Sequence, residues 1–118
     1  MIASAKVAQL VASLALERKA QDVVILEMAR VSPICDFFVI VSAASGVRAR
    51  TIADHVEQYL KSQGVRLGHR EGYREGVWIL MDYGDIVVHI FQTEARRYYR
   101  LDSLWGDAPR HALKDEHP

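Results

Sequence analysis

Three aspartates in the sequence are of the type that could support chemistry on phosphate groups. Asp82 and Asp85 stand close together, and Asp36 begins an earlier apolar segment. Carboxylates that converge can bind a divalent cation, and such a cation serves phosphoryl transfer. The segment Ser42–Gly46 precedes an expected helix whose N-terminus could cradle a phosphate, although it holds one glycine and no lysine. A metal-dependent phosphoryl-transfer enzyme is therefore kept as an alternative function.

Two further reactive side chains, His89 and Cys35, favour chemistry less. No other histidine lies at ligand spacing from His89, because His55 and His69 belong to other expected elements. A histidine stacked beside Trp78 is the simpler interpretation. Cys35 has no evident base partner and is expected to be a small buried residue.

The overall composition limits the class of protein. The chain has 118 residues, of which 50% are hydrophobic, so we expect one domain with a real core. Fifteen basic residues balance fifteen acidic ones, which argues against a general nucleic-acid binder. The single cysteine excludes an internal disulfide. No apolar run approaches the ~20 residues of a membrane span and no signal peptide is evident, so a cytoplasmic protein is expected.

The segment VWILMDYGDIVVHIF, residues 77–91, is typical of two β-strands joined by a tight turn. We place the turn at Tyr83-Gly84, because glycine tolerates the positive φ that such turns need. In this register Asp82 faces Asp85, Leu80 faces Val87 and Trp78 faces His89. Alternation of side chains gives one wholly apolar face, made of Val77, Ile79, Met81, Ile86, Val88 and Ile90. The opposite face carries Trp78, Leu80, Asp82, Asp85, Val87, His89 and Phe91.

The second face is typical neither of a dry core nor of a solvated surface. Like charges set opposite each other destabilise a hairpin, which indicates that Asp82 and Asp85 are kept for function. We predict a partner interface with Trp78 as its main anchor, the two aspartates as a polar edge, and no metal or cofactor. Its apolar centre would consist of Trp78, Leu80, Val87 and His89. The alternative is that the helix expected after Ser45, or the segment around Trp105, covers this face and makes Trp78 a core residue.

The other patterns predict helices and strands that alternate in pairs. They are a helix at about 4–18, strands at 23–26 and 36–41, a helix between Ser45 and Gly64, a short edge strand within 65–73, and a short helix at about 93–101. The fold class is α/β (α+β), a mixed sheet of four or five strands flanked by helices that leave the Trp78 face partly open. The domain is expected to span 1–108. Residues 109–118 lack periodicity and are expected to be a disordered tail.

A basic cluster lies on the last expected helix. Arg96 and Arg100 share one side of it, Arg97 lies nearby, and Tyr98 and Tyr99 are adjacent. Arginine and tyrosine are suited to phosphate contact and base stacking, so contact with RNA is one interpretation. A solvated face with one tyrosine packed inward is the other.

The segment Gly76–Phe91 closely resembles the signature of the ribosomal silencing factor family, also called Iojap-like proteins. The resemblance covers about residues 5–107, nearly the whole domain. One departure is Ala43, where the family usually has glycine, and alanine would stiffen the loop before the second helix. Further matches in the family's order are Lys19-Ala20-Gln21-Asp22, Asp36, Phe38-Val39-Ile40, Ser42, Ser45, Ile52-Ala53-Asp54, Glu71-Gly72, Arg96-Arg97-Tyr98-Tyr99, Leu101 and Leu104-Trp105.

The resemblance implies a function as well as a fold. Members of the family bind the large ribosomal subunit through its protein number fourteen, block joining of the small subunit by occupying space, and so silence translation when nutrients are short. It implies a fold similar to that of nucleotidyltransferases without use of their active site, no enzymatic activity, and a homodimer. The expected partner-binding residues are Trp78, Leu80, Asp82, Asp85, Val87, His89, Arg96, Arg97 and Tyr98, with a minor contact to ribosomal RNA. The alternative is then a nucleotidyltransferase-like enzyme with an Asp82/Asp85 metal site.

Overall fold

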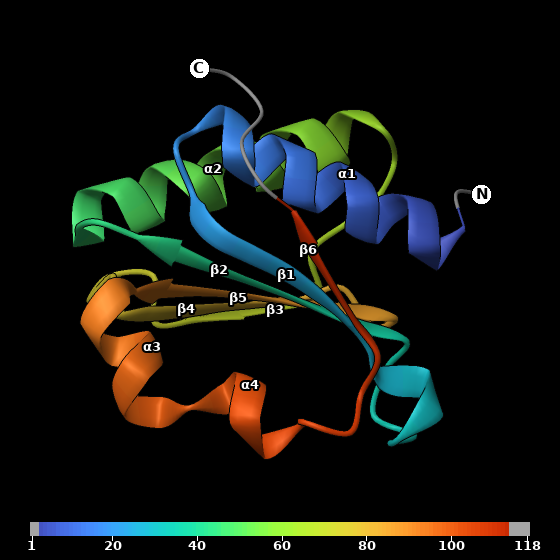
Figure 1. Cartoon of the computed structure of the whole chain (residues 1–118). Coiled ribbons are helices and arrows are strands. Elements are labelled where there is room, and N and C mark those ends of the chain that lie inside the picture. Colours follow the sequence, from blue (N-terminus) through green and yellow to red (C-terminus); the bar gives the residue numbers. More distant parts are fainter. Residues whose placement is uncertain (1–2, 114–118) are drawn as a thin grey trace.

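The computed structural model describes residues 3–113, and these form three layers (Figure 1). Helices α1 (Ser4–Glu17) and α2 (Gly46–Ser62) lie on one face of a β-sheet. The shorter helices α3 (Thr93–Tyr99) and α4 (Leu101–Leu104) lie on the other face. A short 3-10 helix, η1 (Met28–Arg30), connects two strands. No helix within residues 3–113 is long and apolar enough to cross a membrane.

The sheet has six strands in the order β3-β4-β5-β2-β1-β6. The central strands β2 and β5 are parallel, and the other neighbouring pairs are antiparallel. The predicted fold class, a mixed sheet flanked by helices, is confirmed, but the predicted number of four or five strands is too low. The strands are β1 (Gln21–Glu27), β2 (Phe37–Ala43), β3 (His69–Glu71), β4 (Trp78–Asp82), β5 (Ile86–Gln92) and β6 (Arg110–Leu113).

Strand β6 corrects the prediction that 109–118 is a disordered tail. It pairs antiparallel with β1 over its whole length, and His111 contacts the carboxylate of Glu27, with 2.8 Å between Nε2 and Oε2. The strand has four residues that are mostly exposed, so no hydrophobic pattern marks it in the sequence. The domain therefore extends past 108 to at least Leu113. Residues 114–118 of the predicted tail lie outside the described residues.

The hairpin of β4 and β5 has the predicted strands in a shifted register. The turn residues are Gly84 and Asp85 rather than Tyr83 and Gly84, because the N–H of Tyr83 donates to the carbonyl of Ile86. Gly84 has a φ of 88°, which a tight turn of this kind requires. Trp78 lies opposite Phe91, Leu80 opposite His89, and Asp82 opposite Val87. A shift by two positions leaves every side chain on its predicted face, but Asp82 does not face Asp85.

The sheet face beneath α1 and α2 carries the main core. Ser45 caps α2 as predicted, since its Oγ accepts from the N–H of Arg48 at 3.1 Å. The hairpin side chains predicted for this core are buried, namely Ile79, Met81, Ile86, Val88 and Ile90. Val77, which was also predicted for this core, is exposed instead, because it precedes the first residue of β4.

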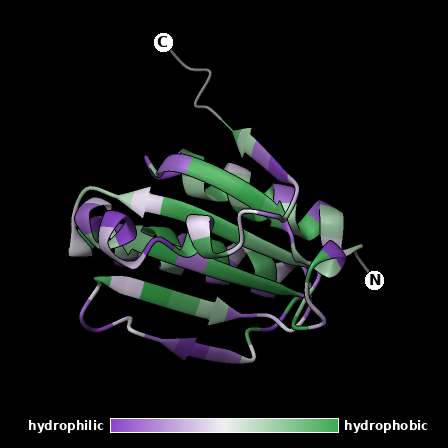
Figure 2. Cartoon of the chain, turned by 60° about the horizontal axis from the view of Figure 1, so that its bottom comes forward, coloured by the Kyte–Doolittle hydropathy of each residue, from purple (hydrophilic) through white to green (hydrophobic). Residues whose placement is uncertain are grey.

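The opposite face carries a second, smaller core. Its buried members are Leu26, Met28, Cys35, Phe38, Ile40, Val87, Phe91 and Ala108. Leu101 and Trp105, from α4 and the residue after it, pack against this cluster. This cover is incomplete: with the lower side of the molecule turned forward, α3 and α4 leave β4 and the hydrophilic edge strand β3 uncovered (Figure 2). A partly open face was predicted, and the opening lies over β4.

A glycine holds the loop before β4 close to that strand. Gly72 has a φ of 76°, and a Cβ atom at this position would lie 2.0 Å from the carbonyl oxygen of Trp78. Neither the left-handed backbone nor the contact tolerates a side chain. The loop can therefore pass beside the first residue of β4 only because position 72 is glycine.

The Gly72→Ala substitution is expected to lower the free energy of unfolding by at least about 3 kcal/mol, because strain and a backbone clash add. Urea unfolding measures the loss. Gly64→Ala is the matched control: Gly64 also has a positive φ, 81°, but a Cβ atom added there would have no neighbouring atom within 4 Å. The control should cost only about 1 kcal/mol. Equal losses in the two variants would contradict the close approach.

Candidate functional site

Trp78 lies where the open and covered parts of the second sheet face meet. Its ring stacks on Phe91, with centroids 4.7 Å apart, and is tilted against Tyr99 at 4.9 Å. It packs against the smaller core but is only half-buried. Trp78 thus packs against the core and is partly exposed, and its role as an interface anchor stays a prediction.

His89 fixes the orientation of Trp78. The indole N–H of Trp78 donates to Nδ1 of His89 at 3.1 Å, so the proton of the neutral imidazole belongs on Nε2. That Nε2 atom is buried and has no hydrogen-bond partner within residues 3–113. Burial lowers the pKa of His89 to about 4. A neutral, buried histidine that accepts from an indole positions that indole. The two rings lie beside each other, but they are tilted by 43° with centroids 5.9 Å apart rather than stacked as predicted.

Exposed aromatic side chains continue the surface around Trp78. Tyr98 and Tyr99 at the end of α3 are 79% and 52% exposed, and their rings meet edge to face at 5.1 Å. Leu80, the next residue of β4 on this face, is half-buried like Trp78. We call Trp78, Leu80, Tyr98 and Tyr99 the Trp78 patch. Tyr99 was not predicted as a site residue, because the sequence left open which of the two tyrosines packs inward.

Val87 and the aspartates of the hairpin are placed differently from Trp78. Val87 is buried in the smaller core, as is His89, which is 4% exposed. Asp82 accepts from the N–H of Gly84 at 2.7 Å, so its carboxylate stabilises the turn. Asp85 is exposed in the turn, and its carbonyl accepts from the N–H groups of Asp36 and Phe37 at the beginning of β2. Trp78 and Leu80 are brought together at the surface, and the two aspartates lie at its turn end.

The three carboxylates considered as metal ligands do not form a common metal-binding site. Within residues 3–113 no group of three or more histidine, cysteine, aspartate or glutamate side chains could hold a metal ion. The carboxylate of Asp36 accepts from the hydroxyl of Ser4 at 2.9 Å, and that of Asp82 accepts from the N–H of Gly84. The alternative of a carboxylate metal site at Asp82 and Asp85 therefore lacks its geometry. Burial raises the pKa of the Cys35 thiol to about 11, which leaves it unreactive at neutral pH.

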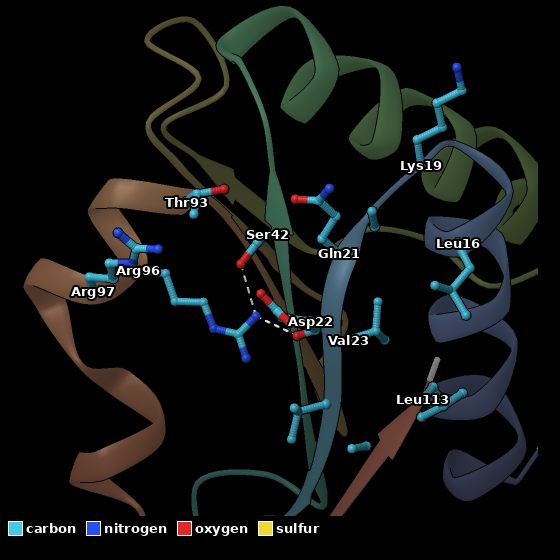
Figure 3. A pocket seen from close by; sticks show the side chains of 13 residues that line it. Leu16, Lys19, Gln21, Asp22, Val23, Ser42, Thr93, Arg96, Arg97 and Leu113 are labelled. Carbon is cyan, nitrogen blue, oxygen red and sulfur yellow. Dashed lines mark hydrogen bonds between the residues drawn. The ribbon is translucent and has the colours of Figure 1, made fainter. Parts of the chain in front are cut away.

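Arg96 serves as a structural cation between α3 and the sheet (Figure 3). It forms a bidentate pair with Asp102 at 2.8 and 3.2 Å, donates to Ser42 Oγ at 3.0 Å, and donates to the carbonyl of Asp22. Its side chain is only 13% exposed. Burial alone would raise the pKa of Asp102, but the hydrogen bonds and charge of Arg96 hold that pKa below its usual value. Arg97, by contrast, is exposed.

Comparisons with known proteins identify one family. The model of a family described as ribosomal silencing factor during starvation matches residues 2–118. A Halalkalibacterium halodurans protein named ribosomal silencing factor RsfS is 42% identical over 93 residues, which are 79% of this chain and 80% of the relative. The Bacillus subtilis protein of that name is 37% identical, with 79% of each chain covered. Chloroplastic protein Iojap of Zea mays is 31% identical over 82% of this chain and 42% of its own.

Solved structures share the fold. A crystal structure of a Chromobacterium violaceum protein has a TM-score of 0.86 and 27% identity, and covers 89% of this chain and 88% of its own. A Bacillus halodurans structure has a TM-score of 0.81 and 34% identity over 93% of this chain and 100% of its own. The relatives named above are regulatory factors, which supports a role without enzymatic activity.

His89 is expected to make the protein less stable in acid. Between about pH 6.5 and pH 4 the unfolded chain binds a proton at His89 that the native state excludes, so the free energy of unfolding falls as the pH falls through this window. The loss from this residue is about 3 kcal/mol. His89→Asn keeps an acceptor near Nδ1 but does not titrate, so its urea stability should fall less across the window. Parallel stability curves for the two proteins would contradict the buried neutral state.

Arg96 is expected to contribute through its hydrogen bonds rather than as a free surface charge. Arg96→Met keeps the aliphatic stem but leaves Asp102 and Ser42 without their donor, which should lower the free energy of unfolding by about 2 kcal/mol. Arg97→Met, at the exposed neighbouring position, should change it by less than about 0.5 kcal/mol. Urea unfolding of both variants at pH 7 tests this contrast. Equal effects at the two positions would exclude the assigned role of Arg96.

Proposed function

This chain belongs to the ribosomal silencing factor family, and we propose that it binds the large ribosomal subunit at the face where the small subunit docks. The direct partner in this proposal is large-subunit protein number fourteen. The half-buried Trp78, oriented by His89 at 3.1 Å, is the observation that carries it. Interface anchors are typically aromatic side chains at an apolar centre with a polar rim.

The Trp78 patch supports contact with a folded protein. It presents aromatic and aliphatic surface from β4 and α3, and these elements are linked by the Trp78–Tyr99 contact at 4.9 Å. An anchor that is already held in one orientation loses little conformational freedom when it is bound. In this proposal the buried His89 acts by holding Trp78, whereas Val87, which lies opposite Asp82, belongs to the core beneath the turn end of the patch.

Acidic side chains border the patch at β3 and the turn. Glu71 lies opposite Leu80 in the sheet, and Asp82 lies opposite His69. Together with the exposed Asp85 they form an acidic rim that fits a basic group on the partner. In the proposal Asp82 and Asp85 therefore contribute mainly to the rate and orientation of binding, while the free energy comes from the patch centre.

The other border of the patch is basic. Arg97, Tyr98 and Arg100 are exposed on or just after α3, and this combination supports a minor contact with ribosomal RNA beside the protein partner. Arg96 belongs to the same helix, but each of its three guanidinium nitrogens donates within the fold, to Asp102, Ser42 or Asp22. We assign it the role of positioning α3 instead of touching the partner.

Silencing by this route is steric and needs no chemical step. The folded body measures 33 × 32 × 31 Å. An object of this size on the docking face would prevent the small subunit from approaching. The cytoplasm, where ribosomal subunits occur, is the location that this proposal implies.

A homodimer also stays a proposal, which the exposed aromatic patch supports. Sedimentation velocity of the free protein measures its oligomeric state.

Trp78→Ala is expected to abolish most binding to isolated large subunits. Loss of a central aromatic anchor typically costs at least about 2 kcal/mol, which is about 30-fold in affinity. Co-sedimentation with purified large and small subunits is the measurement, and wild type should pellet with large subunits only. Tyr59→Ala is the matched control, because Tyr59 is an exposed aromatic residue on the opposite layer.

Three outcomes decide the proposal, provided that circular dichroism shows both variants folded. Loss of binding in Trp78→Ala alone supports it. Binding that persists in Trp78→Ala would contradict the patch as the contact and direct attention to Arg97 and Arg100. Wild type that pellets with neither subunit, or with both equally, would overturn the proposed partner.

A further inference from the structure

We propose that the loop between η1 and β2 carries a second anchor, Ile34, for the protein that binds the Trp78 patch. This inference rests on the proposed function and extends its contact surface to residues 31–35, which we call the Ile34 loop. Ile34 is 63% exposed, and Val31 and Pro33 beside it are exposed as well. The chemistry of this surface fits a folded protein that presents an apolar group flanked by basic side chains.

The Trp78 patch alone is too small for a stable interface. Its four residues come from β4 and α3, whereas a specific interface between proteins involves about 20–30 residues on each side. The contact surface must therefore extend beyond the patch. Exposed aliphatic side chains mark two directions: Leu104 in α4, which is 71% exposed, and Ile34, whose loop lies on the same side of the sheet as α3 and α4 (Figure 1).

The Ile34 loop lies directly beside the hairpin turn at the end of the patch. The carbonyl of Asp85 accepts from the N–H groups of Asp36 and Phe37 at 2.8 and 3.1 Å, so the turn is joined to the residues that follow the loop. Cys35, the last residue of the loop, is buried in the smaller core, on the side of the sheet that carries the patch. The loop therefore continues the open surface past the acidic rim.

Charge distinguishes the two directions. Burial raises the pKa of the Cys35 thiol to about 11, and the negative charges of Asp36, Asp82 and Asp85 contribute to the same shift. This shared effect indicates that the three carboxylates lie around the base of the Ile34 loop. In the other direction Arg100, an exposed cation, stands between α3 and α4. A basic protein surface is therefore attracted toward the Ile34 loop rather than toward α4.

Hydrogen bonds hold the Ile34 loop in one conformation without burying Ile34. The N–H of Ile34 donates to Ser32 Oγ at 3.2 Å. The N–H groups of Val31 and Ser32 both donate to the carbonyl of Met28, at 3.0 and 2.9 Å. Pro33 adds a fixed φ. An aliphatic side chain on a loop braced in this way loses little conformational freedom when it is bound, which is the property expected of an anchor.

The test is co-sedimentation of the full chain with isolated large subunits over a series of protein concentrations. Ile34→Ala is expected to weaken binding about tenfold, because most of an aliphatic side chain leaves the interface. Ile34→Leu keeps the size of the side chain and should bind nearly as well as wild type. Val47→Ala is the matched control, since Val47 is 67% exposed on α2, and its affinity should be unchanged. Both alanine variants should melt within about 3 °C of wild type, because the two positions are exposed.

The salt dependence of binding gives a second readout. Attraction between a basic partner and the carboxylates weakens as salt is added. Asp85→Asn should therefore make the affinity for large subunits less sensitive to salt. Ile34→Ala should lower the affinity by the same factor at every salt concentration, because its contribution is apolar.

The outcomes separate this inference from the proposed function. Wild type that does not bind large subunits would overturn both. Loss of binding in Trp78→Ala with unchanged affinity in Ile34→Ala would overturn this inference alone. Loss in Leu104→Ala instead of Ile34→Ala would place the second contact on α4. If Ile34→Ala converts a dimer to a monomer in sedimentation velocity and leaves the affinity for subunits unchanged, the Ile34 loop is a self-association surface and the inference is wrong.

Discussion

The two central strands are apolar on both faces, and the need to cover both faces governs the rest of the structure. One face is covered by α1 and α2, which have 14 and 17 residues. The other is covered only by α3 and α4, with 7 and 4 residues, and by the segment around Trp105. This second cover lies over β1, β2 and β5 and meets β4 only through the contact of Tyr99 with Trp78 (Figure 2). The surface around Trp78 is the part of the sheet that the short layer covers only at its edge.

The short layer needs an anchor, because helices of this length have little stability of their own. Arg96 supplies it by joining α3 to α4 through Asp102 and to the sheet through Ser42 and the carbonyl of Asp22. The same helix carries Tyr99 against Trp78 on its other side. The position of the exposed patch therefore depends on a buried cation that is itself out of reach of a partner.

The periodicity of apolar residues and the composition of short segments predicted much of this fold, because both reflect interactions between residues that are close in the sequence. The hairpin faces were predicted although the register was wrong by two positions, since side chains repeat with a period of two. The helix after Ser45 was predicted because a cap and an apolar side occur together. Strand β6 could not be predicted, because its exposed residues form a strand only through pairing with β1, which lies far away in the sequence.

The placement of the candidate site residues could be predicted only in part, for the same reason. Trp78 was singled out because it lies on a hairpin face that is neither wholly apolar nor wholly polar. The roles of the charged residues could not be predicted, because the sequence alone does not show whether a charged side chain contacts solvent or an acceptor far away in the sequence. Arg96 and Arg97 are adjacent and chemically alike, yet only Arg96 donates a hydrogen bond to Ser42, which lies 54 residues away in the sequence. The structural role of Arg96 is thus a property of the tertiary fold and not of the local pattern.

The contact between Trp78 and His89 shows what the molecule gives up to hold a half-buried tryptophan in one orientation. A buried donor without a partner costs about 1–3 kcal/mol, and Nε2 of His89 is such a donor within residues 3–113. An apolar residue at position 89 would avoid that cost in a core made for stability alone, but it would leave the indole of Trp78 without its acceptor. The ring could then rotate at the surface, and ordering it on binding would cost free energy. The buried histidine is therefore best understood as serving the half-exposed tryptophan above it.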